Sequence, residues 1–223
     1  MQRSYRECQL THLRICRITY NSALSALARD KTCAQPWEKT LVLLQKMEEM
    51  AANSERKTTL NPDQVSYTIA LGAWLDSRSL SVEDALQAQE LVRRSSQNHN
   101  KLGWNCRPDS HVFSSMMHVC ARVTGTPEER ERVLGIALAA MEECAGGDYG
   151  DASYVAYASC MKAINRLCLD EVRRRELLME LFDECKRTGY VSKQIVIAMK
   201  IGAWNGDVPP LQPEWSRNVP KHG

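Results

Sequence analysis

Apolar residues recur along this chain with helical spacing, and short polar breaks separate one run from the next. Trp37, Leu41, Leu44 and Met47 follow one another at intervals of four, three and three residues, so they form one apolar stripe on a helix. The Asn-Pro-Asp break at residues 61–63 ends that run, because proline lacks a backbone donor and biases the residue before it away from helix. Its aspartate can then cap the next helix. The pattern predicts an all-α fold.

The apolar runs alternate as first and second members of helix pairs. First helices are predicted to begin near Arg17, Gln64, Ser110 and Tyr154, with a fifth near Ser192. Second helices are predicted to begin near Trp37, Val82, Thr126 and Asp170. The first helices share an aromatic residue followed by a small or polar one, which recurs after 47, 46 and 44 residues: Tyr20-Asn21, Tyr67-Thr68, Phe113-Ser114 and Tyr157-Ala158.

This repetition predicts an array of helical hairpins in place of one or two globular domains. The units span about 17–63, 64–109, 110–153 and 154–193, and a terminal helix spans 192–204. A basic segment, 1–16, precedes the array, and a proline-rich tail, 205–223, is expected to be extended. The first segment is poor in acids, as transit peptides are, but its apolar spacing also suits a helix leading into the first unit, so no clear transit peptide is identified.

Composition limits the partners that the sequence can suggest. The 223 residues carry a formal net charge of +2, so no strong global field attracts nucleic acid. No apolar run reaches the roughly 18 residues of a membrane span, so no membrane partner is expected, and a monomer is expected. The nine cysteines form no C-x-x-C pair and are expected to be reduced, buried thiols. No metal or other cofactor is predicted, since Cys106, His111, His118 and Cys120 match no structural zinc spacing.

No catalytic constellation is evident, and the chain is not expected to be an enzyme. The acidic pairs Glu48-Glu49 and Glu142-Glu143 fall on second helices, where they are expected to be solvated. The glycines at 146, 147 and 150 suit a turn and do not form a phosphate-binding loop. The helical units use the chain up to Trp204, which leaves too few residues for a separate catalytic domain.

Three segments resemble the pentatricopeptide repeat (PPR) family. Residues 18–24 (Ile-Thr-Tyr-Asn-Ser-Ala-Leu) resemble its opening helix, residues 37–47 its second helix, and residues 61–63 its closing turn. The long insertions and residues 213–219 are similar to PPR proteins of algal type. The resemblance implies a right-handed superhelical solenoid of about four hairpins plus a terminal helix. It also implies binding of single-stranded RNA, one base per repeat, in mitochondrial or plastid RNA processing, stability or translation.

The resemblance also implies roles for particular residues. Bases would be read by Asn21 with Asp63, by Thr68 with Asp109, and by Ser114 with Ser153. The first pair resembles the uridine-preferring combination and the second the guanosine-preferring one, whereas the third matches no clear code and Ala158 departs from the pattern. Stacking on bases falls to Ile18, Val65, His111 and Val155, and phosphate contact to Arg29, Arg122 and Arg166. In the second unit Asp76 stands at the corresponding position and would repel phosphate.

The same residues admit a purely structural interpretation. Asp63 and Asp109 can act simply as N-caps, and Asn21 and Thr68 can simply solvate a groove. The alternative function is a protein-interaction scaffold whose concave surface binds protein partners without RNA. The distinguishing feature is whether the three arginines line one groove.

Overall fold

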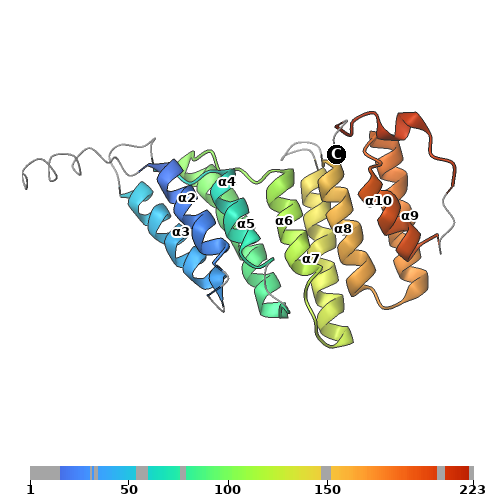
Figure 1. Cartoon of the computed structure of the whole chain (residues 1–223), viewed down its shortest axis with the longest axis horizontal. Coiled ribbons are helices and arrows are strands. Elements are labelled where there is room, and N and C mark those ends of the chain that lie inside the picture. The colour runs from blue at the N-terminus through green and yellow to red at the C-terminus, as the bar shows by residue number, and fades with distance from the viewer. Residues whose placement is uncertain are drawn as a thin grey trace, which may run out of the picture.

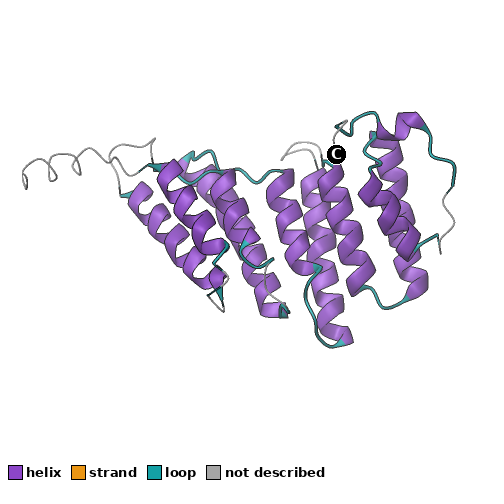
Figure 2. Ribbon diagram, in the orientation of Figure 1, coloured by secondary structure: helices purple, strands orange, loops and turns teal. Residues whose placement is uncertain are grey.

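The computed structural model describes residues 16–30, 32, 35–53, 60–75, 79–146, 152–204 and 209–220. Within these ranges the chain is all-helical, as predicted, and contains no strand (Figures 1 and 2). The helices are α2 (Arg17–Ala28), α3 (Pro36–Ala52), α4 (Gln64–Gly72), α5 (Val82–Leu102), α6 (Ser110–Cys120), α7 (Pro127–Ala145), α8 (Tyr154–Leu167), α9 (Glu171–Thr188), α10 (Lys193–Gly202) and the short 3-10 helix η1 (Pro213–Ser216). The predicted first residues of α2, α4, α6 and α8 are those observed.

The helices pack as successive pairs. Each first helix contacts its own second helix, and α2, α4, α6, α8 and α10 also contact one another in that order. Figure 1 shows the pairs following one another in chain order along the long axis, from α2 and α3 at one end to α9 and α10 at the other. A parallel backbone bridge between Leu80 and Val123 joins the loop before α5 to the loop after α6.

Local capping chemistry explains where the helices begin. Asp63, Ser81 and Thr126 each form a capping box. The cap side chain accepts a hydrogen bond from the backbone N–H of the third helical residue, and the side chain of that residue accepts one from the backbone N–H of the cap. Two long second helices, α5 and α9, end at glycines with φ of 66° and 76°, a conformation that a side chain would disfavour. Both ends of these helices are therefore encoded locally.

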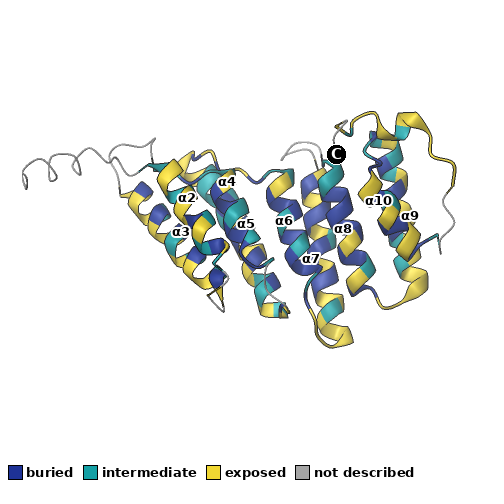
Figure 3. Cartoon of the chain, in the orientation of Figure 1, coloured by how far each residue is buried: buried dark blue, intermediate teal, exposed yellow. Residues whose placement is uncertain are grey.

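The repeated aromatic positions lie in a continuous core. Tyr67 and Phe113 are fully buried and Tyr157 nearly so, whereas Tyr20 in the first pair is only partly buried (Figure 3). Six of the seven described cysteines are also buried, and burial raises the pKa of Cys160 to about 12. No group of three or more His, Cys, Asp or Glu side chains in the described part could hold a metal ion. None of its helices is long and apolar enough to cross a bilayer.

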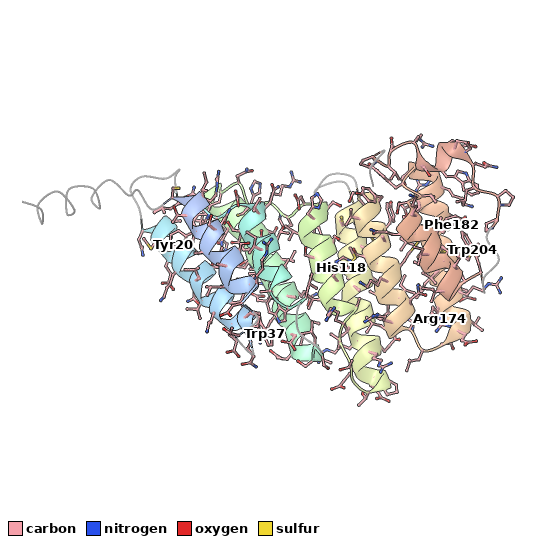
Figure 4. The ribbon with its side chains drawn as sticks, viewed as in Figure 1. Tyr20, Trp37, His118, Arg174, Phe182 and Trp204 are labelled. Carbon is pink, nitrogen blue, oxygen red and sulfur yellow. The ribbon has the colours of Figure 1, made fainter. Side chains whose placement is uncertain are left out.

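The described part of the tail is folded against α9. Val191 donates its N–H to the Trp215 carbonyl at 2.8 Å, and Asn218 donates to the Gly189 carbonyl at 2.9 Å. The Trp215 ring meets Phe182 edge-on, with centroids 6.0 Å apart, and Phe182 also meets Trp204 (Figure 4 labels Phe182 and Trp204). The prediction of an extended tail is therefore wrong for residues 213–219, because the 3-10 helix forms there and the Trp215 ring finds an apolar partner on α9.

Candidate binding surface

The predicted RNA-contacting residues occupy equivalent positions of the first helices. We number the positions of each first helix from its N-cap residue, so that +2 is the second residue after the cap. The N-caps are Cys16, Asp63, Asp109, Ser153 and Ser192. The predicted stacking residues are then at +2, the first residue of each base-reading pair is at +5, and the predicted phosphate-binding arginines are at +13. Positions +2, +5, +9 and +13 lie on one helical face. On α2 an open surface is lined by Ile18, Asn21, Ser22, Ser25, Ala26 and Arg29. Asp76, at +13 of the second unit, lies outside the described residues.

The +2 side chains are largely accessible. Ile18 is 74% exposed and Val65 54% exposed, although both are aliphatic residues that the core could have used. His111 is exposed and Val155 is half-buried. The first three units therefore present an exposed apolar or aromatic side chain at the same position, which is a suitable surface for a flat ring.

Asn21 and Asp63 come together at the junction between the first two pairs. The Asn21 amide donates to the Asp63 carboxylate at 3.2 Å, and its oxygen accepts from the Ser66 hydroxyl at 2.7 Å. Asp63 also caps α4 by accepting from the Ser66 N–H at 3.0 Å, and it pairs with Arg17 at 2.9 Å. Since an amide side chain can make about four hydrogen bonds, Asn21 keeps one N–H and one lone pair for a ligand.

Thr68 and Asp109 are arranged differently from the first pair. Thr68 is half-buried on α4, and Asp109 caps α6 by accepting from the N–H groups of His111 and Val112 at 3.0 and 2.9 Å. In the part of the chain that the structure describes, no hydrogen bond joins Thr68 to Asp109. The Asp109 carboxylate is thus used by its own helix.

Ser114 and Ser153 are not brought together. Ser114 is only 3% exposed, and its hydroxyl lies 2.8 Å from the Ser159 hydroxyl of α8. Ser153 is hydrogen bonded to Ser110. Ser114 therefore lies inside the α6–α8 contact and is not accessible to a base in this conformation.

Positive charge gathers on α6 and α8. We call His118, Arg122, Lys162 and Arg166 the basic cluster. Ser159 lies 3.0 Å from His118 Nε2, and this contact fixes the register between the two helices. Arg122 follows His118 by about one helical turn, and Lys162 follows Ser159 by nearly one turn. Both cations therefore lie on the C-terminal side of the His118–Ser159 contact.

Electrostatic effects within the basic cluster support this placement. Burial, and then the charges of Arg166 and Arg122, lower the pKa of Lys162. Burial, and then Lys162, lower the pKa of His118, which Figure 4 labels on α6. Lys162 and Arg166 are exposed, and among the described residues no ion pair joins either of them to an acid. An anion bound beside the exposed Lys162 and Arg166 would relieve this repulsion.

The structure joins two of the three predicted arginines and adds a lysine. Arg122 and Arg166 belong to the basic cluster, whereas Arg29 directly follows α2, and Figure 1 shows α2 at the far end of the row of pairs. Lys162 was missed, because only position +13 was considered for phosphate. Its spacing of four residues from Arg166 is the signal that could have found it.

One acidic residue expected to be solvated is instead buried. The Glu48 side chain is 12% exposed, accepts from the Tyr67 hydroxyl at 2.6 Å and pairs with Arg94 at 3.1 Å. Asn98 donates to the same hydroxyl at 2.9 Å. Burial raises the pKa of Glu48, and Arg94 opposes this. The expectation for Glu48 is wrong because its partners come from α4 and α5, and the network ties three helices together.

Comparisons with protein-family models, with curated proteins and with solved structures give no significant match. Any indication of function therefore comes from the residues themselves. These combine exposed aliphatic side chains, a hydrogen-bonded amide with spare capacity and the basic cluster on equivalent faces of successive helices.

Proposed function

We propose that the first helices form the inner face of a PPR-like superhelical solenoid and that this face binds single-stranded RNA. The basic cluster carries this proposal. It lies on the same helical face as the exposed Ile18 and Val65, so phosphates and bases would have separate contacts along one surface.

Each group has a distinct task in such a complex. Bases would lie on Ile18 and Val65, and Asn21 would offer its remaining donor and acceptor to a base edge. Lys162 would hold a phosphate with its compact ammonium group, and Arg166 would hold one with its planar guanidinium. If each base contact contributes about 1–3 kcal/mol, two contribute about 2–6 kcal/mol, and the basic cluster would supply the rest of the roughly 8 kcal/mol that micromolar binding needs.

The resemblance to PPR proteins gives this binding a cellular setting. It implies a role in RNA processing, stability or translation in mitochondria or plastids. The chemistry of the surface is consistent with a passive binder, since single-strand contacts protect or expose RNA without a reaction.

The alternative, a protein-interaction scaffold, has one specific observation in its favour. Ile197 and Ile201 at +5 and +9 of α10 are 57% and 69% exposed, at positions where the earlier units have polar or small residues. An acidic peptide with apolar side chains would contact both these residues and the basic cluster.

Fluorescence anisotropy with labelled, mixed-sequence single-stranded RNA tests the proposal. We expect binding that weakens between about 50 and about 200 mM salt, with a smaller salt slope in a Lys162→Ala/Arg166→Ala variant. That variant should bind roughly tenfold more weakly at low salt. The matched control is Arg132→Ala/Arg175→Ala, which removes the same charge from exposed positions on α7 and α9.

Two results would contradict the proposal. Equal losses in the two double variants would show that overall charge, and not the basic cluster, governs binding. Absence of binding at tens of micromolar, with helicity intact by circular dichroism, would exclude RNA. An acidic amphipathic peptide should then be tested in the same assay.

A further inference from the structure

The two ends of the row of helix pairs expose apolar side chains, whereas the middle exposes few. Among the described helices, α4 to α8 expose only two large apolar residues, Val65 and Leu102. The end pairs expose seven: Ile18, Val42 and Met50 at one end, and Val172, Met179, Ile197 and Ile201 at the other. Exposed apolar side chains gathered on the pairs at either end of the described row favour contact with a partner.

The side of each first helix that carries the residue at +10 faces the preceding helix pair. A side chain added at Gly202 of α10 would meet Asn165 of α8 and Leu178 of α9, so backbone and neighbours approach closely there. The corresponding residues of α4, α6 and α8 are fully buried: Ala73, Val119 and Ala163. In α2 the equivalent Ala26 is exposed, as are Ser22 and Ala23.

The side at +5 faces the following pair. Asn21 of α2 bonds to α4, and Ser114 of α6 lies against Ser159 of α8. Ala158 at this position of α8 is 8% exposed, whereas Ile197 of α10 is 57% exposed. Thus α10 presents the side that the next first helix covers on α6 and α8 and partly covers on α2.

The two ends are consequently the separated halves of one interface that recurs within the molecule. The α2 end face, which we define as Thr19, Ser22, Ala23 and Ala26, is small and uncharged. The α10 end face, defined as Lys193, Ile197, Lys200 and Ile201, offers two large aliphatic side chains to fill such a surface. Small residues on one helix admit close approach of a bulky partner.

We propose that the α10 end face of one copy docks on the α2 end face of a second copy, so that the protein associates head to tail. This contact is heterologous, because two different surfaces meet, and it can continue from copy to copy. It departs from the monomer expected from the sequence and does not depend on RNA binding.

Charge disfavours the symmetric alternative. Pairing two α10 end faces would bring Lys193 and Lys200 close to the same residues of the second copy. The α2 end face has no charged residue, so the head-to-tail contact avoids this repulsion. The aliphatic side chains of Ile197 and Ile201 are buried in either arrangement, so the lysines decide between them.

Sedimentation velocity of the whole chain, from low micromolar to several hundred micromolar, tests the inference with two end variants. Ile197→Glu/Ile201→Glu blocks the α10 end face, and Ala23→Glu/Ala26→Glu blocks the α2 end face. The control, Leu102→Glu, adds an acid at an exposed apolar site in the middle of the row. Circular dichroism verifies that each variant is folded.

The wild type and the control should associate with rising concentration, and each end variant alone should remain a monomer. A mixture of the two end variants should form a complex of one copy of each and nothing longer, because only one intact pair of faces is available. A wild type that stays monomeric throughout overturns the inference. Dimerisation of the α2 end variant alone also overturns it, since that requires α10 to pair with itself.

Discussion

The binding face has two halves that share a register but differ in what they expose. On α2 and α4, the +5 residues Asn21 and Thr68 are half-buried and polar. On α6 and α8, the +5 residues Ser114 and Ala158 are buried, and positive charge is concentrated at +9 and +13. In the proposed RNA complex, the first half would read base edges and the second would hold phosphate. Equivalent positions in a repeat therefore do not guarantee equivalent functions.

The difference follows from side-chain length and packing. Ser114 is short and finds Ser159 at 2.8 Å, so the α6–α8 contact closes over it. Asn21 is longer and reaches the N-cap of the next first helix, where part of its amide stays at the surface. The tighter contact in the second half also brings Arg122 toward Lys162, which concentrates the charge.

The largest expected effect tests the close packing at the end of the second half, where α10 meets α8 and α9. Gly202→Ala should lower the free energy of unfolding by about 2–3 kcal/mol, because the added Cβ would lie 1.9 Å from Asn165 Oδ1 and 2.3 Å from Leu178 Cδ1. Gly72→Ala is the control in the first half, where nothing lies within 4 Å. Urea denaturation should show the control unchanged or stabilised by about 0.5–1 kcal/mol. Equal destabilisation by both would show that the halves are packed alike.

A second comparison concerns helix capping. Asp63→Ala should cost about 1–2 kcal/mol of unfolding free energy, because it removes the capping bonds of α4 together with the contacts to Asn21 and Arg17. Ser153→Ala should cost less, since Ser153 makes no capping bond to α8. Denaturant titrations of the two variants measure the difference. Losses of the same size would remove the distinction between the two junctions.

The pH dependence of stability tests the burial of His118. Its pKa is below the ordinary value of 6.5 in the folded chain, so the unfolded chain takes up the proton more readily. The contribution of His118 to the free energy of unfolding is therefore constant above about pH 6.5. As the pH falls below that value, this contribution is lost, by less than about 1.4 kcal/mol per pH unit. His118→Gln should reduce the loss of unfolding free energy between about pH 7.5 and about pH 5.5. An unchanged pH profile would contradict a buried, neutral imidazole.

The smallest expected effect concerns base preference. Thr68→Asn replaces a hydroxyl by an amide, and by analogy with PPR proteins it should shift the second unit from guanosine toward uridine by a few-fold in Kd. Ser114→Asn is the control: it overfills a buried position, so it should destabilise the chain without changing base preference. Anisotropy with two RNAs that differ at one base measures both. A shift caused by Ser114→Asn but not by Thr68→Asn would invert the comparison.

Local chemistry made much of the fold predictable from the sequence. The starts of α4, α5 and α6 follow from caps and the apolar runs after them, which involve only neighbouring residues. The buried state of Glu48 and the folded tail were not predictable in this way. Both depend on partners from other elements. Glu48 bonds to Tyr67 and Arg94, and the tail packs through Trp215 against Phe182.

The site was predictable only in part, for the same reason. The resemblance pairs Asn21 with Asp63 in base reading, which stays a prediction, and the structure places the two side chains 3.2 Å apart. The burial of Ser114 depends on Ser159, which is 45 residues away along the chain. Lys162 stands out only once α6 and α8 are aligned, because the sequence does not show which cations face one another.

The backbone bridge between Leu80 and Val123 bears on the elasticity of the molecule. Thr124 donates its N–H to the Leu80 carbonyl at 2.9 Å, so the loops of the second and third pairs are tied by main chain and not only by side-chain packing. Arg122 immediately precedes this tie and is held by it. Under tension or on loading with a ligand, the middle of the row should act as a stiff segment. Changes in the angle between neighbouring pairs would then be taken up at the junctions on either side, between α2 and α4 and between α8 and α10.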